Sequence, residues 1–281
     1  MSLCTRYNRC SSANIGFLLY RHTLLPLLEH RPLPIGRAPV VIGAMGGSGT
    51  RVLVPILQLA GFWMGSWICR RTQDAMATRH LLQCAFPRLL NGRGNDDEHL
   101  LTLFSRLIQA HRLGMTDPDA DWGWKNPRNM WIIPFLVRCY PEMKFIHLIR
   151  DGRDMALTEN HNLLRKHGAY LLGEPDCEQN WIRSQFRLWA MGNRLAWEAG
   201  QKYLGENYLL LDYDQLCSSP EQELRRIYGH VGIEPDDRLI AIARRLFISS
   251  TSTGRWRESK NPMLHRPDED LREVLTFFGY E

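Results

Sequence analysis

The sequence lacks an apolar stretch long enough to cross a membrane as a helix. Such a helix needs about 18 or more consecutive apolar residues, and the closest candidate, residues 17–28, is interrupted by Arg21, His22 and Pro26. The seven cysteines include no CxxC pair, and they are odd in number and widely spaced. This spacing predicts neither a disulfide framework nor a zinc site. We therefore expect free thiols in a reducing compartment, the cytoplasm.

An excess of charge over the body of the chain is also missing. The formal net charge of the 281 residues is +5, and residues 1–38 account for +4 of it, with five arginines and one acidic residue, Glu29. Because the rest is nearly neutral, we do not expect nucleic acid as a partner of the body. The basic arm resembles a transit peptide in composition, but we favour a basic extension that packs on the surface.

From residue 39 onward the sequence alternates between strand and helix patterns. Residues 40–44 form a short run rich in β-branched residues, which predicts a buried strand. Further strands are predicted at 123–125, 145–149 and 208–211, and helices at 127–138, 151–165 and 181–202. This alternation indicates an α/β domain over residues 39–281 with a mainly parallel sheet. Residues about 70–120 interrupt the rhythm and predict a helical insertion on the substrate side.

A glycine-rich turn, residues 46–49, follows the first predicted strand and precedes a helical pattern. Backbone N–H groups of such a turn bind anions at the helix N-terminus. A Walker A loop continues with Lys and then Ser or Thr, but those positions hold Thr50 and Arg51. The turn therefore predicts a phosphate site that is poorly equipped for Mg²⁺-dependent ATP hydrolysis. No acidic residue follows at the spacing that a dinucleotide fold requires.

A second motif, Arg-Asp-Gly-Arg-Asp at residues 150–154, follows the strand predicted at 145–149. The carboxyl end of such a strand is where α/β sheets bind ligands. We expect the following helix to turn Thr158 toward the same side, so that Arg150 and Thr158 bind phosphate oxygens.

Five motifs in this order resemble the sulfotransferases that use 3′-phosphoadenosine 5′-phosphosulfate (PAPS). The glycine turn resembles their 5′-phosphosulfate loop, and residues 150–158 resemble their 3′-phosphate motif. Lys125 stands where the family has a strand-end lysine, and residues 211–216 resemble its Tyr-Glu-Asp-Leu stretch. Residues 254–257 resemble the late segment that closes over the 3′-phosphate. The matches span residues 40–257.

The resemblance implies a three-layer P-loop-like α/β fold that transfers a sulfuryl group from PAPS to a hydroxyl or amine. PAP, the 3′,5′-bisphosphate of adenosine, is then the product, and no metal is expected. The implied acceptor is a small molecule, a lipid or a carbohydrate. The implied nucleotide-binding residues are Gly46, Gly47, Ser48, Gly49, Thr50, Arg51, Arg150, Thr158, Tyr213, Gly254 and Arg255.

This sequence departs from the family pattern at two positions. Gly47 stands where the family loop has Lys or Arg, and Arg51 is a nearby candidate to replace that cation. Pro127 stands where cytosolic members have a histidine base, so the general base is unassigned. Lys125 is the expected catalytic cation, and Asp74 and His80 are our candidates for the base. Glu98, His99 and His111 are further candidates in the same insertion.

Three other functions stay open at this point. Gly47 and the missing histidine also fit a non-catalytic or diverged protein that binds the nucleotide without transfer. An ATP-dependent kinase on a similar scaffold is less compatible with the missing Walker lysine. A nucleic-acid binder would use only the basic arm. The sequence leaves the acceptor and the oligomeric state undetermined.

Overall fold

The computed structural model describes residues 37–92, 94–173, 179–246 and 253–280. The predicted basic arm, residues 1–38, lies outside the described residues except for its last two positions. None of the helices in the described ranges is long and apolar enough to span a bilayer.

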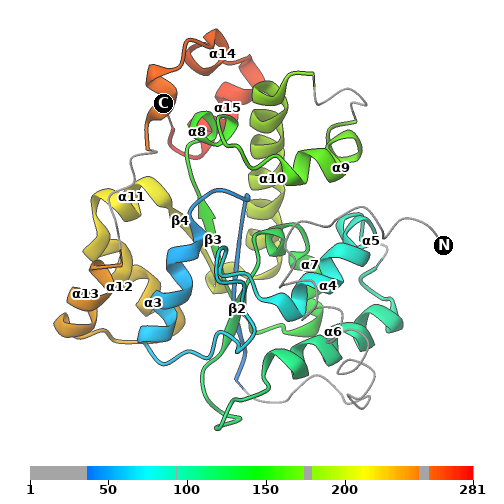
Figure 1. The fold of residues 1–281 in the computed structure, drawn as a ribbon, viewed down its shortest axis with the longest axis vertical. Coiled ribbons are helices and arrows are strands. Elements are labelled where there is room, and N and C mark those ends of the chain that lie inside the picture. Colours follow the sequence, from blue (N-terminus) through cyan, green and yellow to red (C-terminus); the bar gives the residue numbers. More distant parts are fainter. Residues whose placement is uncertain (1–36, 93, 174–178, 247–252, 281) are drawn as a thin grey trace.

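Four parallel strands form the central sheet, in the order β2-β1-β3-β4 (Figure 1). They are β1 (Val40–Ala44), β2 (Gly123–Lys125), β3 (Lys144–Ile149) and β4 (Tyr208–Asp212). In the register, Val41 lies between Trp124 and Phe145 on the neighbouring strands. The predicted strands and the parallel sheet are confirmed, with bounds that differ by at most one residue at an end.

Separate hydrophobic clusters cover the two faces of the sheet. Side chains alternate between faces along a strand, and accordingly Val40 and Ile42 belong to one cluster while Val41 belongs to the other. The first cluster packs against α3 (Leu53–Leu59), α12 (Pro220–Val231) and α13 (Asp237–Arg244). The second packs against α7 (Ile133–Cys139), α10 (Trp181–Tyr203) and α15 (Glu269–Phe277). The fold is therefore a three-layer α/β arrangement.

Three helices lie between residues 70 and 120: α4 (Met76–Cys84), α5 (Phe86–Leu90) and α6 (Glu98–His111). Asp97 caps α6, because its carboxylate accepts hydrogen bonds from the amides of His99 and Leu100. The buried side of α6 includes Phe104, whose ring lies 6.0 Å from that of Trp124 in β2. The helices therefore cover the β2 side of the sheet.

Two of the predicted helices are wrong in extent. The segment 127–138 divides at Ile132 into η3 (Pro127–Trp131) and α7, because Pro134 lacks the N–H that a continuous helix would use. The segment 151–165 divides into α8 (Gly152–Ala156) and α9 (Asn162–Leu172). Between them the Thr158 hydroxyl accepts a hydrogen bond from the amide of Asn160, a local turn that competes with the helix.

The remaining elements are short and lie mainly at the carboxyl edge of the sheet or near the C-terminus. They are η2 (Thr50–Val52), η4 (Gly205–Asn207), α11 (Tyr213–Ser218), η5 (Arg255–Glu258) and α14 (Pro262–His265).

Two glycine-to-alanine changes, one in α8 and one in α12, test the helix packing. A Cβ on Gly152 would lie 2.4 Å from Cε3 of the buried Trp189, so Gly152→Ala should destabilise the fold by about 1–3 kcal/mol. On α12, a Cβ on Gly229 meets nothing within 4 Å, so Gly229→Ala should stabilise it by about 0.4–1 kcal/mol. Urea unfolding measures the free energy of unfolding of both variants. Equal changes in the two variants would contradict the packing described for Gly152 and Gly229.

Candidate functional site

The glycine turn leaves the carboxyl end of β1 as a tight loop. Both the amide and the hydroxyl of Ser48 donate to the carbonyl oxygen of Met45, at 3.2 and 2.8 Å. Gly49 has a φ of 94°, and a Cβ there would lie 2.3 Å from Cε2 of Tyr213. The ring of Tyr213 therefore packs directly on the loop, and only glycine fits beneath it.

The structure gives a physical reason for glycine at position 47, where the resemblance leads one to expect a cation. Gly47 has a φ of 109°, in the region that side-chain-bearing residues rarely adopt. A Cβ there would also lie 3.0 Å from Oγ1 of Thr158. Thr158 thus reaches the glycine loop from the turn after α8, not from a helix face as the sequence predicted. A lysine or arginine at position 47 would be strained in this backbone.

Arg51 lies in the first turn after the loop and is exposed. Its Nη1 donates to the carbonyl oxygen of Arg71 at 3.4 Å. The positive charge of Arg51 is among the influences that lower the pKa of Lys125. The guanidinium of Arg51 is therefore on the Lys125 side of the loop.

Lys125 ends β2 as a buried cation, with 2% of its side chain exposed. Its ammonium donates to Oδ1 of Asp74 at 2.6 Å and to the carbonyl oxygen of Thr72 at 2.7 Å. Burial lowers the pKa of Lys125, and the Asp74 carboxylate opposes this shift. Because an ammonium has three N–H donors, one remains for a ligand. The structure thus joins two predicted catalytic residues, Lys125 and Asp74, in one ion pair.

Of two other base candidates, only His111 has a described side chain. His80 is on α4, but its side chain lies outside the part of the chain that the structure describes. His111 is buried at the end of α6, where its Nε2 lies 2.8 Å from the carbonyl oxygen of Gly123. Burial lowers the pKa of His111 to about 4. His111 is therefore a neutral core residue, and its hydrogen bond joins α6 to β2.

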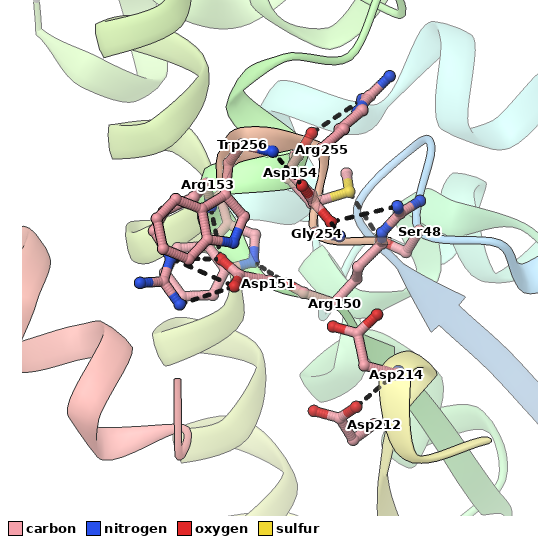
Figure 2. Close-up of polar contacts among 12 residues, drawn as sticks. Ser48, Arg150, Asp151, Arg153, Asp154, Asp212, Asp214, Gly254, Arg255 and Trp256 are labelled. Atoms are coloured by element: carbon pink, nitrogen blue, oxygen red, sulfur yellow. Dashed lines mark hydrogen bonds and ion pairs between the residues drawn. The ribbon is translucent and has the colours of Figure 1, made fainter. Parts of the chain in front are cut away.

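The buried carboxylate of Asp154 organises the other side of the site, as Figure 2 shows. Its Oδ2 accepts a hydrogen bond from the amide of Gly254 at 2.6 Å, and its Oδ1 accepts one from the amide of Trp256 at 3.0 Å. Arg150 pairs with the same carboxylate at 3.4 Å. Asp154 thus holds the late segment, residues 254–256, against the Arg150 motif.

The contacts of Asp154 also determine where the side chain of Arg255 lies. Its Nη2 donates to the backbone carbonyl oxygen of Asp154 at 2.9 Å. Its Nε is buried and has no hydrogen-bond partner among the described residues. A buried donor of this kind costs free energy unless a ligand satisfies it. The guanidinium of Arg255 is therefore positioned beside α8 with donor capacity for an anion.

The guanidinium of Arg153 lies between a carboxylate and an aromatic ring. It pairs with Asp151 at 2.8 Å, and its Cζ lies 3.8 Å from the centroid of the Trp256 ring. The indole of Trp189 donates to the carbonyl oxygen of Arg150 at 2.9 Å. These contacts fix both ends of the 150–154 motif, so Arg153 is a positioning residue.

Tyr213 begins α11 and lies beneath the guanidinium of Arg150, with Cζ 5.0 Å from the ring centroid. Asp212 caps the helix by accepting from the amides of Asp214 and Gln215. Burial and the charge of Asp212 raise the pKa of Asp214, whereas Arg150 lowers it. A second carboxyl group thus lies within electrostatic reach of Arg150.

The sequence did not reveal Asp154, Trp256 or Asp214 as site residues. Asp154 is part of the quoted Arg-Asp-Gly-Arg-Asp motif, but its partners at residues 254 and 256 lie about a hundred residues away. No group of three or more His, Cys, Asp or Glu side chains within the described ranges is arranged to hold a metal ion.

A comparison with protein families matches residues 39–237 to the model of the sulfotransferase family. The chain belongs to this family. A curated relative is omega-hydroxy-beta-dihydromenaquinone-9 sulfotransferase Stf3 of Mycobacterium bovis, 24% identical over 162 residues. That match covers 56% of this sulfotransferase chain but only 40% of the relative.

Solved structures with the same fold include a sulfotransferase domain from the curacin biosynthetic pathway. It is 13% identical with a TM-score of 0.52, over 88% of this chain and 99% of that domain. Mouse sulfotransferase SULT7A1, solved with PAP, is 15% identical with a TM-score of 0.52, over 87% of this chain and 86% of the mouse chain. These likenesses confirm the predicted P-loop-like α/β fold.

The role of Asp154 can be tested without any ligand. Asp154→Asn should leave at least one of the amides of Gly254 and Trp256 without its acceptor and destabilise the fold by about 1–3 kcal/mol. Hydrogen exchange at residues 254–256 should become faster. Asp268→Asn, which removes an exposed partner of Arg183, is the control and should change neither quantity. Unchanged exchange in Asp154→Asn would refute the anchoring role.

Proposed function

We propose that this sulfotransferase transfers a sulfuryl group from PAPS to a hydroxyl or amine of a small-molecule acceptor. One observation carries the proposal, which is that two guanidiniums lie at Asp154, beside the glycine loop. Arg150 forms an ion pair with the Asp154 carboxylate, and Arg255 donates to its backbone carbonyl oxygen. Two guanidiniums gathered beside such a loop suit a nucleotide with a phosphate group in addition to its 5′ chain. ATP carries phosphates only in its 5′ chain.

The residues of the site fit the nucleotide. The backbone amides of the loop, residues 46–50, would bind the 5′-phosphosulfate. Arg150, Thr158 and Arg255 would bind the 3′-phosphate, and the buried Nε of Arg255 would gain its missing acceptor. The ring of Tyr213, which packs on the loop, would lie beside adenine. A mouse sulfotransferase with the same fold was solved with PAP, which supports PAP as the product nucleotide.

PAPS, when bound, supplies an activated sulfuryl group. The ammonium of Lys125 would stabilise negative charge that develops on the leaving phosphate, because a buried donor is already oriented and partly desolvated. Arg51 would add a second positive charge on the same side, in place of the cation that position 47 cannot carry.

Asp74 is the general base that we propose. Its Oδ1 lies 2.6 Å from the Lys125 ammonium, and 23% of its side chain is exposed. An accessible carboxylate can accept the proton of an acceptor hydroxyl. His80, on the following helix, remains the second candidate for this proton.

Two predictions from the sequence belong to this proposal as well. We propose a cytoplasmic location from the cysteine pattern. We also propose that the protein is able to form an oligomer. The acceptor named for the mycobacterial relative is a menaquinone derivative. With 24% identity over part of that protein, its acceptor does not identify the one used here.

Transfer from ³⁵S-labelled PAPS to a panel of phenols, alcohols and amino sugars tests the proposed activity. Release of PAP, measured in parallel, reports turnover even when water is the acceptor. Lys125→Gln should reduce turnover by about 10²–10³-fold, the usual loss for one oriented donor. Binding of PAP without label transfer or PAP release in the wild type would favour the non-catalytic alternative.

The pH dependence of turnover tests the Lys125–Asp74 pair. Because burial lowers the pKa of Lys125, the active ammonium form should be lost as pH rises, at a pH below the ordinary value of 10.5. Asp74→Asn removes the carboxylate that raises this pKa, so the alkaline limb of the pH–turnover curve should move to lower pH.

The same change tests the general base. Asp74→Asn should reduce turnover by about 10²–10⁴-fold if Asp74 is the base.

Asp119→Asn, at an exposed position of the same insertion, is the matched control and should leave both the limb and the rate unchanged. An alkaline limb that stays in place in Asp74→Asn would show that Lys125 does not titrate against Asp74. A normal rate in that variant would remove Asp74 as the base and leave His80.

A further inference from the structure

A second group of basic side chains lies outside the nucleotide residues. It consists of Arg79 on α4, Arg128 on η3, and Lys166 and His167 on α9. Two of them contact the ring of the buried Phe86 on α5: the Arg128 guanidinium lies 5.7 Å from its centroid, and the His167 ring lies 4.8 Å from it. Figure 1 shows α4, α5 and α9 on the same side of the molecule.

These cations act on one another. Burial lowers the pKa of Arg128, and the charge of Arg79 lowers it further. Burial likewise lowers the pKa of Lys166, and Arg128 and Arg79 add to the shift. The pKa of His167 falls to about 4 through burial, Arg128 and Lys166. Arg79, Arg128 and Lys166 are therefore close enough to repel one another, and Arg128 and Lys166 also disfavour the charged form of His167.

Within the described ranges, neither Arg79 nor Arg128 forms an ion pair with a carboxylate. Arg128 donates to the carbonyl oxygen of Leu82 at 3.5 Å, and Arg79 contacts Sδ of Met76 at 3.9 Å. The one carboxylate that raises the pKa of Arg128 is Asp74, which is already paired with Lys125. Like charges gathered in this way cost free energy that an anionic ligand would offset.

The group lies next to the proposed reaction centre and is distinct from the nucleotide site. Arg128 follows Lys125 within the same strand-end segment, and Arg79 follows Asp74 at the start of α4. Arg150 and Arg255, in contrast, interact with Asp154 on α8, through an ion pair and a hydrogen bond. A ligand held by Arg79 and Arg128 would therefore approach the Lys125–Asp74 pair from the insertion.

We propose that Arg79, Arg128 and Lys166 bind an anionic group of the acceptor, a phosphate or a carboxylate, and so place its hydroxyl or amine at Asp74. This inference rests on the proposed sulfuryl transfer and adds the chemical class of its acceptor. Two arginines suit either anion, because each guanidinium presents paired N–H donors. The aromatic ring beneath Arg128 holds that guanidinium in place.

The test is calorimetric titration of the protein saturated with PAP, so that the nucleotide's anion site is filled. The probes are inorganic pyrophosphate, glucose 6-phosphate and benzoate, which separate a phosphate from a carboxylate. At least one probe should bind, and Arg79→Gln/Arg128→Gln should weaken it tenfold or more while PAP binding stays within twofold. Arg79→Gln/Lys166→Gln, which spares the half-buried Arg128, should also weaken it if the first variant fails to fold.

Arg225→Gln/Arg244→Gln is the matched control, since it removes two exposed arginines on α12 and α13. It should bind the probe as the wild type does. Absence of probe binding to the wild type, or equal binding by the cluster variants, would overturn the anionic-acceptor proposal while sulfuryl transfer stands. Failure of PAP to bind the wild type would instead refute the proposed function itself.

Discussion

The parallel direction of all four strands is the constraint on which the site depends. Because every strand points the same way, the segments that follow β1, β2, β3 and β4 emerge at one edge of the sheet. The glycine loop, Lys125, Arg150 and Tyr213 each lie at such a strand end. Residues that are far apart in the sequence therefore lie together at the carboxyl edge of the sheet.

Buried charge in the proposed site is arranged in pairs whose cations would still have donors for a ligand. Asp154 neutralises Arg150 and fixes the late segment, and Arg255 keeps a buried Nε without an acceptor among the described residues. On the other side, Asp74 neutralises Lys125. Each carboxylate lowers the cost of burying its cation, and each cation keeps hydrogen-bonding capacity. This pattern is typical of a site built for polyanions rather than of a structural salt bridge.

The strands were predictable from the sequence, because buried parallel strands are short β-branched runs, and the glycine turn after the first strand added a moderate local signal. The break at Ile132 was also encoded, in Pro134, but periodicity concealed it. The position of Thr158 was not predictable, since it depends on where α8 ends. The contacts of Asp154 join residues too distant in sequence for any local pattern to reveal them.

The central claim is that the nucleotide recognised here carries a 3′-phosphate. Calorimetry with PAP, with 5′-AMP, which lacks that phosphate, and with ATP–Mg²⁺ tests it most directly. The contacts expected from Arg150 and Arg255 predict that PAP binds at least about tenfold more tightly than 5′-AMP, since hydrogen bonds to charged groups contribute about 1.5–3 kcal/mol each. Equal affinities for PAP and 5′-AMP, or a preference for ATP–Mg²⁺, would contradict the account.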